Sequence, residues 1–72
     1  MEEIYMSEFA ENLRYFRRER NLSQLALGEK INVGYTMISM LESGRIIPDS
    51  EMVVVLAKAL DISTKELFKN SN

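Results

Sequence analysis

Residues 22–48, LSQLALGEKINVGYTMISMLESGRIIP, decide the fold of this 72-residue chain. Ser23 is a typical helix N-cap, and the pattern after it predicts a helix over 24–31. A second helix is predicted over 35–43 and ends at Gly44, since glycine readily takes the left-handed conformation that follows a helix. Three residues separate the two helices, and so short a connection forces them to cross steeply, as in a helix-turn-helix.

The residues in and around this connection suit a tight turn. Asn32 tolerates a positive φ better than other non-glycine residues. Gly28 provides a small residue where the two backbones approach, although it costs about 1 kcal/mol of helix propensity relative to alanine. Val33 and Ile38 are expected to pack beneath the turn. We therefore predict a turn over residues 32–34.

The rest of the chain also shows helical patterns. Apolar residues recur at helical spacing, Asp49 is a typical N-cap, and Ser63 with Glu66 forms the pattern of a capping box. Three further helices are thus predicted, over residues 7–20, 50–60 and 64–68. With no strand pattern, the chain is expected to be a single all-α domain over 1–72, with a core of about 7–69, an N-terminal arm at 1–6 and a C-terminal tail at 70–72.

Composition excludes several classes of protein. The chain has no cysteine and no histidine, so it lacks the usual ligands of structural zinc and the commonest general base. No nucleophile–base pair or phosphate-binding glycine loop is present, and no apolar run reaches the ~20 residues that span a bilayer. We expect a cytoplasmic protein that is not an enzyme and binds no metal, cofactor, small molecule or membrane. The net charge of −2 disfavours non-specific binding of nucleic acid.

The chain resembles the Xre family, the helix-turn-helix domains of phage Cro proteins and repressors. The resemblance is carried by Arg17, Leu22-Ser23-Gln24, Leu27, Ile31, Val33, Ile38-Ser39, Leu41-Glu42, Gly44 and Pro48, followed by Leu56-Ala57 and Leu60. It implies a compact five-helix, lambda-repressor-like fold that binds double-stranded operator DNA. The family usually has alanine at the position of Gly28 and glycine at that of Asn32, which we interpret as steric near-equivalents.

The resemblance also implies which residues read the DNA bases. In this family the second helix of the motif enters the major groove, and the matching positions are Tyr35, Thr36, Met37 and Met40. This set has no arginine for guanine and no asparagine or glutamine for adenine, which predicts modest specificity from each half-site. Met37 has an alternative role as packing filler.

Three residues are candidates for phosphate contacts. Gln24 lies at the N-terminus of the first motif helix, where free N–H groups favour an anion. Ser43 and Arg45 lie at the end of the second motif helix. By contrast, Arg17 and Glu42 match a pair that forms an internal salt bridge in related domains, so their predicted role is structural.

The helix over 50–60 has more apolar residues than one core face explains, which suggests a dimer interface. The residues predicted for this interface are Met52, Val55, Ala59, Ile46 and Ile47. Alternatively, they form a wide core face that is closed by residues 4–6.

Two functions remain open from the sequence. The first is a sequence-specific transcriptional regulator, a repressor or controller protein that binds its operator as a homodimer. The second is a protein-interaction module, such as an antitoxin, that retains the helix-turn-helix fold.

Overall fold

The computed structural model describes residues 2–69 of the chain and the side chains of residues 8–69. Within that range the structure has five helices and no strand. The helices are α1 (Glu2–Glu19), α2 (Gln24–Lys30), α3 (Tyr35–Glu42), α4 (Ser50–Leu60) and α5 (Thr64–Phe68). The predicted all-α, five-helix fold is confirmed.

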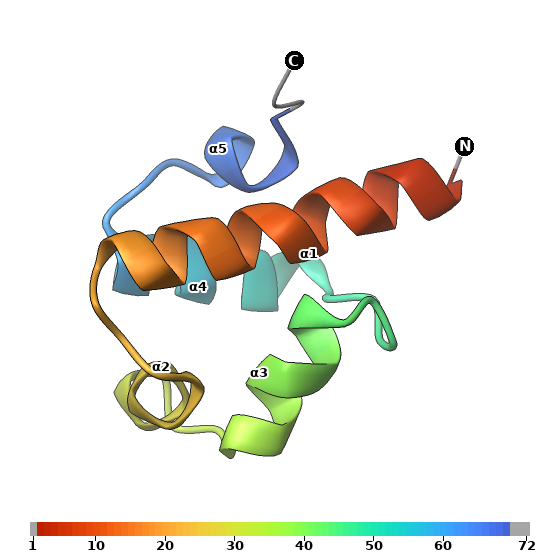
Figure 1. Cartoon of the computed structure of the whole chain (residues 1–72). Coiled ribbons are helices and arrows are strands. Elements are labelled where there is room, and N and C mark those ends of the chain that lie inside the picture. Colours follow the sequence, from red (N-terminus) through yellow and green to blue (C-terminus); the bar gives the residue numbers. More distant parts are fainter. Residues whose placement is uncertain (1, 70–72) are drawn as a thin grey trace.

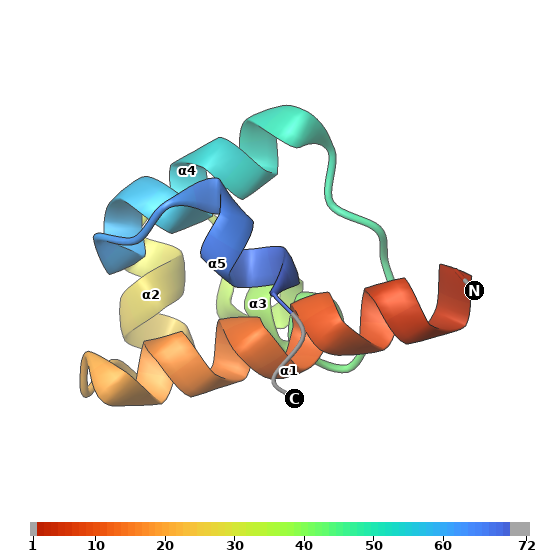
Figure 2. The same ribbon diagram turned by 90° about the horizontal axis from the view of Figure 1, so that it is seen from above.

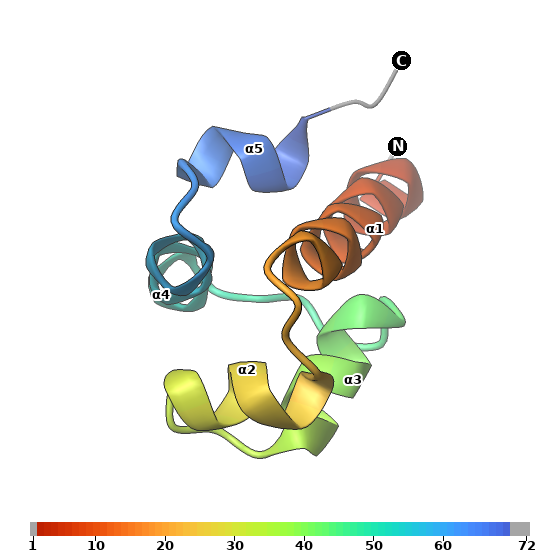
Figure 3. The same cartoon turned by 60° about the vertical axis from the view of Figure 1, so that its left-hand side comes forward.

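The helices form a small bundle around α1, which is the longest of them. Helix α1 packs against α5 and against α3 (Figure 1). Helices α2 and α3 pack together and cross steeply beneath it, while α4 lies at one edge of the bundle and contacts α5 (Figure 3). The α2–α3 pair is thus attached to the bundle through α1 and exposes one side.

The core is made of large aliphatic side chains and one phenylalanine from all five helices. Its buried members are Phe9, Leu13, Leu27, Ile38, Leu41, Val53, Leu56, Ala57, Leu60 and Leu67. Burying such side chains is the main favourable term in folding. The core therefore fixes the position of α2 and α3 through Leu27, Ile38 and Leu41.

Positive φ angles occur where short connections leave a helix. Asn21, Asn32 and Asp61 have φ values of 58°, 65° and 59°, and Gly44 has 77°. The predicted left-handed conformation of Asn32 is confirmed. Asp61 was not predicted to adopt it, although aspartate is among the residues that tolerate it.

Several predicted helix ends differ from the structure, and α1, α2 and α3 each end one residue earlier than predicted. Helix α1 begins at Glu2 rather than Ser7. Residues 2–7 therefore belong to the helix and do not form a separate arm. Ser63 is the N-cap of α5 but makes no side-chain capping bond, so the capping box is incomplete. The other predicted caps are present, since Ser23 accepts from the backbone N–H of Ala26 and Asp49 from that of Met52. The tail at 70–72 and the side chains of residues 4–6 lie outside the described residues.

Asn12 in α1 and Arg20, which directly follows α1, close the ends of other helices. Asn12 donates to the backbone oxygens of Leu67 and Lys69, at 3.1 and 2.8 Å. Arg20 donates to the backbone oxygen of Leu60 at 2.8 Å. Because the last carbonyls of a helix lack intrahelical partners, these bonds tie α5 and α4 to α1. In the described part of the chain, no helix is both long and apolar enough to cross a membrane.

Candidate nucleic-acid interface

The turn between α2 and α3 is closed by the backbone. The N–H of Val33 donates to the oxygen of Gly28 at 2.8 Å, and the positive φ of Asn32 reverses the chain just before this bond. Gly34 is the N-cap of α3 and makes no side-chain capping bond, because glycine has no side chain. These features hold the N-terminus of α3 next to the end of α2.

Gly28 is buried in α2 at the closest approach to the turn. A Cβ added there would lie 2.7 Å from the oxygen of Val33 and 3.2 Å from the backbone carbon of Gly34. Both contacts are with backbone, so no side chain can rotate away to make room. Treating alanine as a near-equivalent of Gly28 is therefore wrong for this chain.

An ion pair between α1 and α3 is buried beneath the motif. Arg17 Nε and Nη2 donate to Glu42 Oε2 and Oε1 at 2.5 and 3.0 Å, and the two residues are only 8% and 3% exposed. The hydrogen bond to Glu42 raises the pKa of the Arg17 guanidinium above its usual value, although burial acts in the opposite direction. The structure thus contains the internal pair that the resemblance implies.

The same carboxylate connects α2 to this pair. Gln24 Nε2 donates to Glu42 Oε1 at 3.1 Å, while Arg17 Nη1 donates to the backbone oxygen of Leu22, just before α2, at 2.8 Å. Arg14, which is more exposed, donates to the backbone oxygen of Glu42 at 3.2 Å. Glu42 therefore positions α1, α2 and α3 relative to one another.

The outer side of α3 begins with two exposed residues. Tyr35 is 56% exposed, and Thr36 is also exposed. Met40 is half-buried. Met37 differs from the expected base-reading set, because its side chain packs against the core, which agrees with the alternative role of packing filler.

Ser39 is a residue of α3 that the sequence analysis did not assign to the reading set. It is half-buried and lies one helical turn after Tyr35, so the two share a face.

The phosphate candidates lie at the start of α2 and at the end of α3, which the hydrogen bond from Gln24 to Glu42 brings together. Gln24 starts α2 and already donates one amide hydrogen to Glu42, so its second amide hydrogen remains for another acceptor. Ser43 donates its hydroxyl hydrogen to the backbone oxygen of Met40 at 3.2 Å. Arg45 is exposed in the loop after α3.

The residues predicted for a dimer interface are not equally exposed. Met52, Ala59 and Ile46 pack against the core, and Val55 is half-buried. Ile47 is 76% exposed. Val54, which the prediction did not include, is exposed on α4 at 43%. The inner and outer sides of a helix this apolar are hard to separate by spacing alone.

The chain matches a known family over most of its length. Residues 13–67 match the family HTH_3, described as Helix-turn-helix. Among curated proteins, the HTH-type transcriptional activator BcrR of Enterococcus faecalis is 37% identical over 61 residues, which are 85% of this chain and 30% of BcrR. The chain thus spans less than a third of the length of that relative.

Solved structures show the same arrangement of helices. The restriction-modification controller protein C.AhdI from Aeromonas hydrophila is 30% identical, with a TM-score of 0.83 over 88% of this chain and 91% of that one. The hypothetical transcription factor NHTF from Neisseria has a TM-score of 0.89 over 93% of this chain and 77% of that one. At 24% identity, the likeness to NHTF concerns the fold alone.

Proposed function

The chain belongs to the helix-turn-helix family HTH_3, as its resemblance to the Xre family indicates, and from this we propose that it is a DNA-binding transcriptional regulator. It acts as a controller or repressor that binds a short operator as a homodimer. Helix α3 enters the major groove, and the two copies of α3 lie roughly 34–36 Å apart, one turn of DNA.

One observation carries this proposal: the first two residues of α3 are exposed while the opposite side of the helix is anchored in the core. Tyr35 and Thr36 are exposed, whereas Ile38 and Leu41 are fully buried. A reading helix needs both properties, since its outer side chains must reach base edges while the helix itself stays rigid. The ion pair of Arg17 with Glu42 adds to this rigidity.

The relatives support the same class of function. BcrR is named a transcriptional activator and C.AhdI a restriction-modification controller protein. Of the two, C.AhdI matches this chain over nearly its whole length, which favours the controller role.

We expect Thr36→Ala to change base preference at one position of the operator. Thr36 offers a hydroxyl that can bond a base edge and a methyl group that can contact thymine. Sites would first be selected from a random DNA pool with the wild-type protein. Anisotropy titrations with single-base variants of the selected site should then show a change of up to about tenfold at one base pair, with the salt dependence unchanged.

Arg45→Ala tests the phosphate contacts. Because a phosphate contact carries no base information, this variant should weaken binding to all sites about equally. The slope of log K against log salt should become smaller by roughly one unit per lost contact.

The control is Glu66→Gln on α5, which leaves the α2–α3 pair unchanged. It should alter neither the base preference nor the salt dependence. If Thr36→Ala and Arg45→Ala had identical effects, the assigned reading face would be wrong. If the wild-type protein enriched no sequence from the pool, the protein-interaction function would replace the proposed one.

A further inference from the structure

Helix α4 has an outer face that no other described helix covers. It lies at the edge of the bundle in two views of the molecule (Figures 2 and 3). Its inner residues Val53, Leu56, Ala57 and Leu60 are buried, so the opposite side of the helix faces outward. This outer face is therefore open to a partner.

A regular stripe of exposed residues runs along this face. Glu51, Val54 and Lys58 are all exposed, and their spacing of three and four residues places them on one side of the helix. Val55 is half-buried beside them. Among the residues that the structure describes, neither Glu51 nor Lys58 has an intramolecular ion pair or side-chain hydrogen bond.

The charges on this stripe complement a second copy of the same stripe. Glu51 and Lys58 lie seven residues apart, about 10 Å along the helix, and their midpoint falls between Val54 and Val55. An antiparallel copy about a two-fold axis at that midpoint places Glu51 of each copy opposite Lys58 of the other. A parallel copy in the same register would instead place like charges together.

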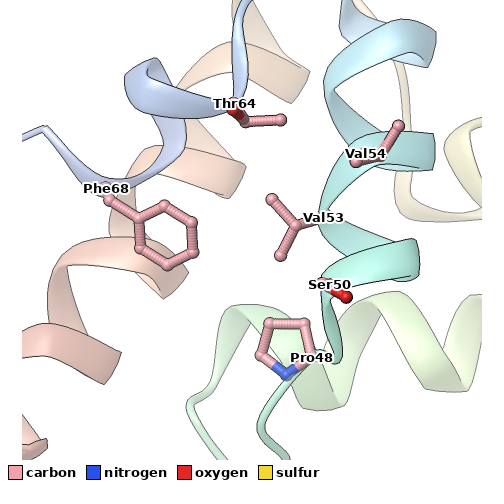
Figure 4. A pocket seen from close by; sticks show the side chains of 6 residues that line it. All are labelled: Pro48, Ser50, Val53, Val54, Thr64 and Phe68. Atoms are coloured by element: carbon pink, nitrogen blue, oxygen red, sulfur yellow. The ribbon is translucent and has the colours of Figure 1, made fainter.

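A hollow beside the stripe adds apolar surface. It has a volume of about 370 Å³ and is lined by Pro48, Ser50, Val53, Val54, Thr64 and Phe68. Val53 of α4 and Phe68 of α5 point toward each other across it (Figure 4). Because Val54 belongs both to the hollow and to the stripe, a helix lying on the stripe also covers the edge of the hollow.

We propose that the outer face of α4 is the homodimer interface, in which two α4 helices pack antiparallel around Val54 and Val55. Two symmetric ion pairs, each joining Glu51 to Lys58 of the second copy, set the direction of the helices. This proposal rests on the homodimer of the proposed function and names its surface. This interface replaces the one predicted from the sequence, since Met52 and Ala59 pack against the core.

Charge reversal tests the direction of the pairing. Glu51→Lys and Lys58→Glu each turn two attractive contacts into two repulsive ones, since every contact of a two-fold interface occurs twice. Sedimentation equilibrium should show a dimer dissociation constant raised by roughly tenfold or more for each single variant. The double variant Glu51→Lys with Lys58→Glu restores opposite charges at both sites and should recover most of the wild-type affinity.

A second variant tests the apolar centre, and a control tests the site. Val54→Glu should give monomers whose helical circular dichroism is unchanged, because Val54 is exposed in the monomer. Glu29→Lys reverses an exposed charge on α2 and should leave the dimer intact. The proposal is overturned if the double variant is as weak as the single ones, or if Val54→Glu remains fully dimeric.

DNA binding measured on the same variants separates this proposal from the proposed function. If the charge reversals behave as expected but the wild-type protein binds no selected DNA, the interface stands and the proposed function fails. If the protein binds DNA while the reversals leave its dimer unchanged, the proposed function stands and this interface is wrong.

Discussion

Replacing Arg17 by alanine should destabilise the domain by up to about 3–5 kcal/mol, because the buried carboxylate of Glu42 then keeps only the longer ion pair of 3.7 Å to the more exposed Arg14. Glu42 is 3% exposed, so water cannot replace the lost guanidinium. A chain of this size has a total stability of roughly 4–11 kcal/mol. Urea unfolding should therefore show a midpoint that is clearly lowered, because the loss is a large share of this total.

The matched control is Arg18→Ala, which removes a neighbouring arginine that is exposed on the same helix. Surface changes of this kind usually lie within about 0.5 kcal/mol. Equal effects of the two variants would show that Arg17 is ordinary surface charge.

A double replacement distinguishes the attraction between Arg17 and Glu42 from the free-energy cost of burying their charges. Arg17→Met combined with Glu42→Leu should be less destabilising than either single change, since apolar residues of similar volume often replace a buried pair at little cost. The recovery will be incomplete, because Gln24 and the oxygen of Leu22 also lose hydrogen bonds to this pair. A double variant as unstable as the sum of the single ones would mean that the two residues do not interact.

Substitutions at Gly28 should destabilise the domain in order of side-chain size. Helix propensity alone would make alanine about 1 kcal/mol more stable than glycine. The added Cβ, however, meets the oxygen of Val33 at 2.7 Å, and crowding in a packed interior typically costs about 1–3 kcal/mol. We expect Gly28→Ala to lose up to about 2 kcal/mol and Gly28→Val to lose more.

Gly34 provides the control for these substitutions. It lies in the same turn, yet a Cβ added there has nothing within 4 Å. Gly34→Ser should be neutral or slightly stabilising, because serine is a good N-cap residue. Thermal unfolding of the variants gives the order of their stabilities directly. A Gly28→Ala variant more stable than wild type would show that the backbone of the turn shifts at little cost.

The local features of the fold could be predicted from the sequence because neighbouring residues determine them. Helix ends at Ser23, Asp49 and Gly44, and the left-handed turn at Asn32, follow from conformational preferences that act within a few residues. The later start predicted for α1 shows the limit of this reasoning. Residues 2–7 lack a clear apolar stripe, yet they continue the helix.

The site could be predicted only in part. The positions of Tyr35 and Thr36 on the outer side of α3 agree with the reading face that the family resemblance implies. Met37 is half-buried and packs against the core, so it lies at the boundary between core and solvent. Spacing alone cannot assign a residue at that boundary.

Five helices, the turn at Asn32 and the family could all be predicted from the amino-acid sequence, since periodicity, caps and a motif in register are local signals. Only the tertiary structure showed that Glu42 receives hydrogen bonds from both Arg17 and Gln24, and that Arg20 and Asn12 close the ends of α4 and α5. These bonds join residues 18 to 55 positions apart. Which groups meet over such separations depends on how the helices pack, and packing is a property of the whole core.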